Sequence, residues 1–191
     1  MWTAPVVSSA AASEPIDLEA AVDHLRAQGL GDEAEISRFI SSARAHVESY
    51  TGTRLITQTL TLRADEWEDL AALPVAPVQS VSSISYVDTD GATQTLAGSV
   101  YDARLYGLEP SIVLKYNQTW PTIRMGSLIT VTAVVGYGAA SAVPAELLHA
   151  IRLVIADMYR YRETVQSGET VAAYPLAATF EALLANHRKF V

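Results

Sequence analysis

Apolar residues recur at helical spacing in two segments near the start of the chain. A short amphipathic helix is predicted after Asp17, a residue type that often caps a helix N-terminus, and it ends before Gly29. A longer helix is predicted from about Asp32 to Gly52, because a glycine commonly follows the last residue of a helix. Its apolar stripe consists of Ile36, Phe39, Ile40, Ala43, Val47 and Tyr50.

Beyond Gly52 the spacing of the apolar residues changes from helical to alternating. Residues 55–63 alternate and are rich in Thr and branched side chains, which is typical of a strand. Residues 81–87 alternate as well, and the Asp90-Gly91 pair that follows them predicts a hairpin turn. The other segments that read as strands are 93–96, 101–105, 112–116 and 128–135. The middle of the chain is therefore predicted to be an antiparallel lobe of about six short strands.

Helical spacing returns towards the end of the chain. Pro144 favours the first turn of a helix with a wide apolar face, and a last amphipathic segment is predicted from about Leu176. The order of helices, then strands, then helices predicts an α+β fold, in which an antiparallel β-lobe is inserted into a helical body. The predicted divisions are a flexible N-terminal arm at 1–14, a single α+β domain at 15–163 with its β-lobe at about 54–138, and a linker with a C-terminal helical segment at 164–191.

The arm is assigned from its composition. Residues 1–14 are mostly Ala, Ser, Val and Pro without periodicity, so we expect them to be flexible. They lack a basic region followed by a sustained apolar stretch, so we do not expect a signal peptide.

Charge and cysteine content limit the classes of partner and site. The chain has 13 Lys and Arg against 21 Asp and Glu, a net charge of −8, and this balance is poorly suited to gripping phosphate backbones. It has no cysteine, which excludes disulfides and thiolate metal sites. No segment has the run of about eighteen apolar residues that a membrane span needs, so we expect no membrane partner.

The sequence contains no spaced motif for catalysis or metal binding. It lacks the HExxH and G-x-S-x-G patterns, and no Lys follows Gly136-Tyr137-Gly138 as a phosphate loop would require. The four histidines stand in separate segments, at His24, His46, His149 and His187. We therefore expect no enzyme, cofactor or metal. Two alternatives stay open, namely a hydrolase with dispersed residues around Asp88, Asp90 and Tyr137, and a module whose β-lobe binds a protein or a glycan.

An aromatic residue in a predicted loop is a candidate for partner contact. Trp120, followed by Pro121, stands between two predicted strands. An aromatic side chain at such a place either covers the core of a sheet or projects towards a partner, and the sequence leaves both readings open.

Several short stretches, in their order and spacing, resemble the gp6-like head–tail connector (adaptor) proteins of long-tailed phages and gene transfer agents. The resemblance covers roughly residues 15–190, and no single stretch is diagnostic by itself. The stretches that carry it are 18–26 (LEAAVDHLR), 47–59 (VESYTGTRLITQT), 73–74 (LP), 77–81 (PVQSV), 86–91 (YVDTDG), 118–121 (QTWP), 131–138 (VTAVVGYG) and 143–144 (VP).

The resemblance implies a structural protein of the virion neck, made in the bacterial cytoplasm. Members of that family form a homo-oligomeric ring, typically a dodecamer, beneath the portal protein ring. The ring extends the DNA channel without sequence-specific binding and offers a platform for the stopper or tail-completion protein. The binding module named above would then be a non-viral alternative to this role.

Within this resemblance we assign three sets of candidate residues. Acidic side chains near the channel or its rim would repel DNA and let it slide; they are Asp65, Glu66, Glu68 and Asp69. Apolar side chains of the C-terminal segment would dock on the portal; they are Tyr174, Phe180, Leu183, Leu184 and Phe190. The third set is the loop at Trp120 and Pro121, as a partner-facing loop. The sequence leaves open whether the C-terminal helix instead folds back on its own domain.

Overall fold

The computed structural model describes residues 1–161 and 176–189. The predicted linker and two of the predicted portal-binding residues, Tyr174 and Phe190, lie outside this described part. The chain divides into two compact units, one of strands and one of helices. This architecture confirms the predicted α+β class with a β-lobe.

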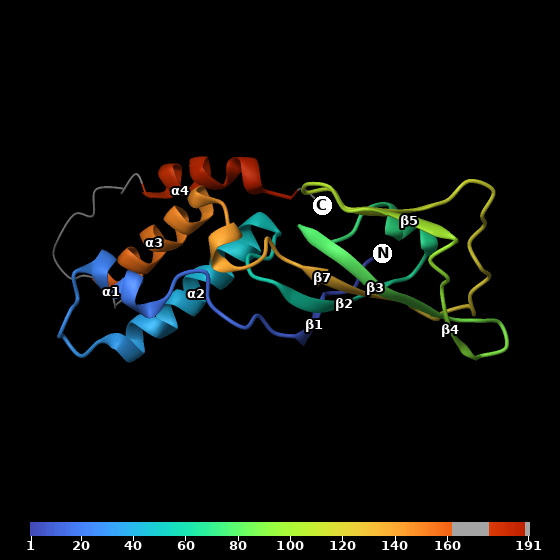
Figure 1. Ribbon diagram of the computed structural model, residues 1–191, viewed down its shortest axis with the longest axis horizontal. Coiled ribbons are helices and arrows are strands. Elements are labelled where there is room, and N and C mark those ends of the chain that lie inside the picture. The colour runs from blue at the N-terminus through green and yellow to red at the C-terminus, as the bar shows by residue number, and fades with distance from the viewer. Residues whose placement is uncertain (162–175, 190–191) are drawn as a thin grey trace. The chain divides into compact units, whose positions relative to one another are not determined.

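The helical unit comprises Ser13–Thr51 and Gly138–Arg188. Its helices are α1 (Leu18–Leu25), α2 (Glu33–Thr51), α3 (Ala145–Arg160) and α4 (Leu176–Leu184), with 3₁₀ turns at η2 (Ala140–Ala142) and η3 (Ala185–His187). Asp17 caps α1 as predicted, because its carboxylate accepts a hydrogen bond from the Ala20 backbone N–H at 2.7 Å. Four residues of the predicted α2 stripe are buried, and the other two, Phe39 and Tyr50, are partly buried. Helix α2 packs against α3, which also contacts α4 (Figure 1).

The strand unit comprises Met1–Ala12, Gly52–Tyr137 and the end of the chain from Lys189. Its five-stranded sheet has the order β1-β2-β7-β3-β4, and every neighbouring pair is antiparallel. A separate two-stranded sheet is formed by β5 and β6. The bounds are β1 (Val6–Ser9), β2 (Gln58–Ala64), β3 (Val78–Val87), β4 (Thr93–Thr95), β5 (Tyr101–Arg104), β6 (Ser111–Leu114), β7 (Ile129–Val135) and the 3₁₀ turn η1 (Trp67–Ala71).

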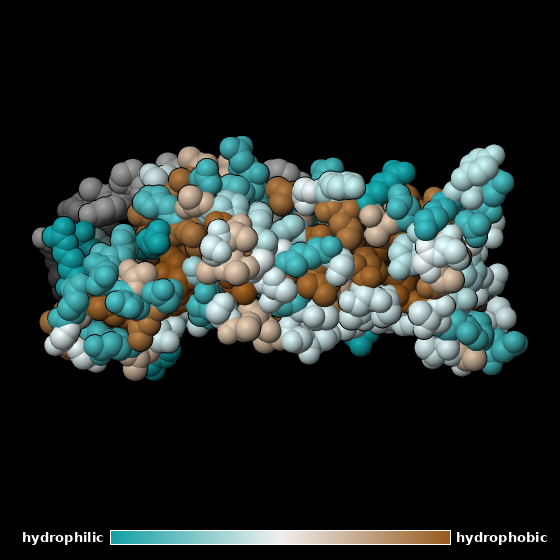
Figure 2. Space-filling view, in the orientation of Figure 1, coloured by the Kyte–Doolittle hydropathy of each residue, from teal (hydrophilic) through white to brown (hydrophobic). Residues whose placement is uncertain are grey.

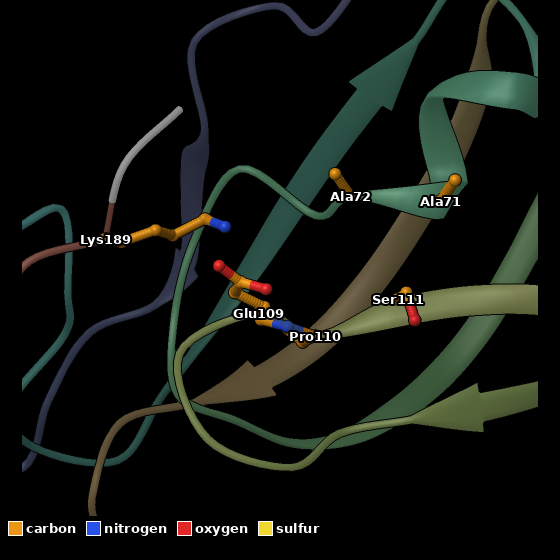
Figure 3. A pocket seen from close by; sticks show the side chains of 6 residues that line it. All are labelled: Ala71, Ala72, Glu109, Pro110, Ser111 and Lys189. Carbon is orange, nitrogen blue, oxygen red and sulfur yellow. The ribbon is translucent and has the colours of Figure 1, made fainter.

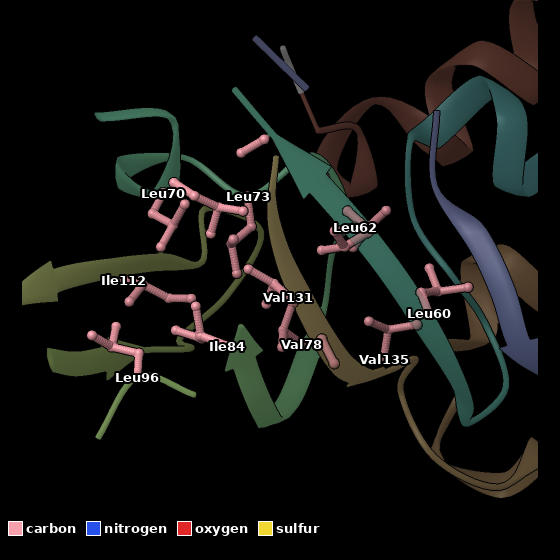
Figure 4. Close-up of a cluster of buried hydrophobic side chains, with 14 of the residues drawn as sticks. Leu60, Leu62, Leu70, Leu73, Val78, Ile84, Leu96, Ile112, Val131 and Val135 are labelled. Atoms are coloured by element: carbon pink, nitrogen blue, oxygen red, sulfur yellow. The ribbon is translucent and has the colours of Figure 1, made fainter. Parts of the chain in front are cut away.

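Alternation along the strands places the core of this unit on one face of the five-stranded sheet. Every second residue of β2 and β7 is buried, and the residues between them are partly or fully exposed. Figure 4 shows side chains of β2, β3 and β7 directed into one cluster with Ile112 of β6 and Leu70 of η1. Several of these side chains have no exposed surface, and they fill the space between the two sheets.

The predicted flexible arm instead contains a strand. β1 pairs with β2 at the edge of the sheet, with Val6 opposite Thr61 and Val7 opposite Leu60. Ahead of β1, the Trp2 indole N–H donates to the Ala72 carbonyl at 2.8 Å. Composition could not indicate this strand, because all four of its side chains are exposed and its pairing uses backbone groups.

Candidate interaction surfaces

The predicted acidic residues lie together where β2 runs into η1. Asp65, Glu66 and Glu68 are exposed, and Asp69 is partly exposed. The Met1 ammonium group and the Glu66 backbone N–H donate to the Asp69 carboxylate, and these bonds lower the pKa of Asp69. Asp69 is therefore held in its ionised form, beside the exposed carboxylates of the other three residues.

A shallow pocket of about 370 Å³ borders the acidic cluster. Asp65 and Glu66 line one side of it, and the loop before β7, with Arg124 and Met125, lines the other. The pocket thus has both acidic and basic side chains at its rim.

Trp120 and Pro121 are held in place by contacts with the buried side chain of Trp67. The Trp120 ring stacks on the buried Trp67 ring with their centroids 4.8 Å apart and an angle of 2° between the rings. The Trp67 indole N–H donates to the Pro121 carbonyl at 2.9 Å. Both Trp120 and Pro121 keep partly exposed surface, so this loop is a fixed feature that covers the core and also reaches solvent.

The described part of the C-terminal segment packs within the helical unit. Phe180 is 8% exposed; its ring lies 5.3 Å from the His46 ring and meets the Tyr50 ring edge-on at 5.4 Å. Leu184 is fully buried, whereas Leu183 is partly exposed. Docking on a partner through Phe180 or Leu184 would therefore require α4 to leave this packing.

In the hairpin between β3 and β4, the Asp88 carboxylate accepts hydrogen bonds that stabilise the turn itself. The Gln94 side-chain amide and the backbone N–H groups of Ala92 and Asp90 donate to the Asp88 carboxylate, and they lower its pKa. Figure 2 shows hydrophilic residues gathered at this hairpin, at the lower right. A carboxylate held ionised in this way is a poor general acid, so the geometry offers no support for a hydrolase centred on Asp88.

A buried lysine is the feature that sequence reasoning missed. Lys189 is only 9% exposed, and its ammonium group donates to the Leu108 carbonyl at 3.4 Å. It borders a pocket of about 390 Å³, also lined by Ala71, Ala72, Glu109, Pro110 and Ser111, and its amine is directed towards the Glu109 carboxylate (Figure 3). Burial lowers the pKa of Lys189, against a smaller opposing effect of Glu109. One Lys near the end of a chain carries no pattern that indicates burial.

A second buried polar group lies just after β7. The Tyr137 hydroxyl is enclosed and has no hydrogen-bond partner among the described residues, and burial raises its pKa. An unpaired buried hydroxyl is destabilising, on the order of 1 kcal/mol or more.

The shifted pKa values of Lys189 and Tyr137 should have opposite effects on stability at alkaline pH. The lowered pKa of Lys189 means that the unfolded chain binds more protons than the folded chain just below the ordinary pKa of 10.5, so the free energy of unfolding rises with pH in that range. The raised pKa of Tyr137 means that the folded chain keeps a proton that the unfolded chain loses above pH 10, so stability falls there.

Two variants separate the contributions of Lys189 and Tyr137 when the free energy of unfolding is measured with urea from pH 7 to 11. Lys189→Met should raise stability at pH 7 by about 1 kcal/mol and remove the rise with pH, because it keeps the buried methylenes and removes the charge. Tyr137→Phe should raise stability by a similar amount and remove the fall above pH 10. An unchanged pH profile in both variants would contradict the assignment.

Within residues 1–161 and 176–189, no three His, Asp or Glu side chains are grouped in a way that could hold a metal ion. None of the helices described there is both long and apolar enough to cross a membrane.

Comparison with known proteins finds structural similarity and no match at the level of sequence families. No protein-family model matches the sequence, and no curated protein matches it. Solved structures, in contrast, contain chains with the same fold over nearly the full length.

Three such chains come from gene transfer agent (GTA) particles. A chain from the neck of an empty GTA particle, computed with C6 symmetry, has a TM-score of 0.80 at 22% identity and covers 99% of this chain and 97% of its own. A chain from the virion of a native GTA particle has a TM-score of 0.79 at 23% identity, with the same coverage. A chain from the neck of a native GTA particle, computed with C12 symmetry, has a TM-score of 0.72 at 23% identity and covers 97% and 96%. This chain therefore has the fold of those neck and virion chains.

Proposed function

We propose that this chain is a head–tail connector, a structural protein of the virion neck that assembles as a ring beneath the portal. In this role it extends the DNA channel and joins the capsid to the stopper or tail-completion protein. It acts without catalysis or a cofactor, and DNA passes through the ring without sequence-specific contacts.

One observation carries this proposal. The fold matches chains from the neck of GTA particles at TM-scores of up to 0.80, and the match spans both units rather than one common motif. The symmetries of those particles, C6 and C12, support a ring as the form of assembly. The resemblance of the sequence to head–tail connectors points to the same role.

The charge of the chain suits a channel that DNA slides through. Twelve copies of net charge −8 would carry −96, and a wall of that sign repels phosphates. We place Asp65, Glu66, Glu68 and Asp69 near the channel or its rim, where their exposed carboxylates would contribute to this repulsion. Crosslinking of packaged DNA to the ring should leave these residues unmodified, and adducts at them would contradict this placement.

We place portal attachment in the C-terminal segment, at Tyr174, Phe180, Leu183, Leu184 and Phe190. Deletion of residues 171–191 should abolish portal binding if the segment docks on the portal. It should also lower the melting temperature without collapse of the fold, because it removes the buried Phe180 and Leu184 from the helical unit. Collapse of the fold on deletion would instead assign the segment to its own domain. Leu183→Ala is the milder variant, because Leu183 is partly exposed whereas Phe180 is buried.

Co-sedimentation with the portal ring encoded beside this chain tests the proposal as a whole, with electron microscopy of the pelleted fraction. We expect a closed ring stacked on the portal. No association over a range of salt concentrations, with the full C-terminal segment present, would overturn the proposal, and a non-viral binding module would then be the better reading.

A further inference from the structure

One face of the five-stranded sheet carries side chains that the core does not use. On β2, β7 and β3 most of the residues that alternate with the core positions are Ser and Thr, and Val134 and Arg63 lie among them. We call this set the hydroxyl face; it comprises Thr59, Thr61, Thr130, Thr132, Ser83 and Ser85. Strand pairing sets them in rows, with Thr132 opposite both Thr61 and Ser83. All six are partly exposed.

The hydroxyl face is free of negative charge in a strongly acidic chain. None of the residues of β2, β3 or β7 is Asp or Glu, although the whole chain has 21 of them. The only ionisable side chain among the outward positions of these three strands is Arg63, which pairs opposite Thr130. One Arg is too few to hold a nucleic acid backbone, so DNA is a poor occupant for this face.

The absence of negative charge makes this face suitable for a second copy of the same chain, which is the occupant that we argue for. Two chains of net charge −8 repel each other wherever their acidic surfaces meet, and a neutral face is where they can approach at least cost. The centres of protein interfaces are depleted in charged residues. The small side chains of Ser and Thr also allow two surfaces to approach closely.

The strand unit also has exposed apolar side chains that could contact the hydroxyl face of a neighbouring copy. Tyr106, Tyr116 and Met125 are 89%, 91% and 98% exposed, and each lies in a loop or turn outside the strands. Exposed aromatic residues and Met are enriched at protein interfaces. A ring closes through contacts between two different surfaces of adjacent subunits, so the hydroxyl face needs a counterpart of this unlike kind.

We propose that the hydroxyl face is the surface on which the next copy of this chain packs in a head-to-tail ring. The inference rests on the proposed ring assembly and assigns one of its two contact surfaces. The contact buries Thr132 at the centre of the face and leaves the tip of the β3–β4 hairpin outside it.

Thr132→Glu tests the proposal, with Thr89→Glu as the matched control. Both add the same charge to the strand unit, but Thr89 is exposed at the hairpin tip. Mass photometry and electron microscopy, alone and with the portal ring, should show the wild type and T89E as rings. T132E should stay monomeric at concentrations at least tenfold above those at which the wild type assembles, with an unchanged circular dichroism spectrum. Rings formed by T132E at the wild-type concentration would overturn the inference and leave the proposed function standing.

A cysteine variant keeps the proposal testable if T132E fails to fold. The chain has no cysteine, so Thr132→Cys and Thr89→Cys each introduce a single thiol. In the assembled ring a bulky maleimide should label Cys at 132 at least tenfold more slowly than in the monomer, and Cys at 89 equally fast in both. If maleimide labels Cys at 132 equally fast in the ring and in the monomer, the inference is overturned. It is also overturned if Cys at 132 becomes protected only when the portal is added to a preformed ring, because the portal would then cover this face. A wild type that forms no ring, alone or on the portal, overturns the proposed function and the inference with it.

Discussion

Gly136→Ala should destabilise the strand unit by about 4 kcal/mol, near the upper end of single-residue effects. Gly136 has φ +107°, and an added Cβ would lie 2.5 Å from the Ile56 carbonyl oxygen and 2.6 Å from its carbon. Backbone atoms cannot rotate away as the end of a side chain can. Gly136 is also held from both sides, because its N–H donates to the Pro77 carbonyl at 2.9 Å and its carbonyl accepts from the Gln79 amide at 2.9 Å.

Gly126→Ala is the control that separates backbone conformation from overlap. Gly126 has a similarly unfavourable φ of +74°, but no atom lies within 4 Å of an added Cβ. Its cost should be about 1–2 kcal/mol, the usual penalty for a non-glycine residue in that region. Urea unfolding followed by circular dichroism measures both variants. Equal losses of stability would show that the approach of residue 136 to Ile56 is not the constraint.

The sequence was sufficient to predict those elements that are stabilised by residues close to one another in the chain. The Asp17 cap, the stripe of α2 and the Asp90-Gly91 hairpin each depend on residues within a few positions of one another, and the structure confirms all three. β1 could not be found in this way, because its edge pairing with β2 joins residues fifty or more positions apart and leaves no buried side chain in β1.

The candidate surfaces were less accessible to prediction than the fold. Proximity in sequence was enough to group the acidic residues from Asp65 to Asp69. The stack of Trp120 on Trp67, the burial of Lys189 and the uncharged hydroxyl face all depend on which strands become neighbours. Pairing between distant strands is set by the whole fold, so no single stretch of sequence contains it.

Trp67→Ala should destabilise the strand unit by about 3–5 kcal/mol, as expected for removal of a buried indole. Trp67 is 7% exposed; it stacks on Trp120, meets Tyr86 edge-on with the ring centroids 5.5 Å apart, and donates to the Pro121 carbonyl. Trp67→Phe is the matched control, because it keeps an aromatic ring and loses the N–H donor. Its cost should be about 1–2 kcal/mol, from the lost hydrogen bond and the smaller ring.

Trp120→Ala then separates the two readings of this loop. If Trp120 only covers the core, the variant should lose about 1 kcal/mol of stability from the aromatic stack and assemble with its partners as the wild type does. If the loop also meets a partner, the same modest loss of stability should come with a loss of assembly at least tenfold in concentration. Trp67→Ala removes the support under the loop, whereas Trp120→Ala removes only the partly exposed ring that rests on it. Measured by chemical unfolding and by co-sedimentation with the portal, the two variants therefore distinguish a loop that stabilises the sheet from one that also binds a partner.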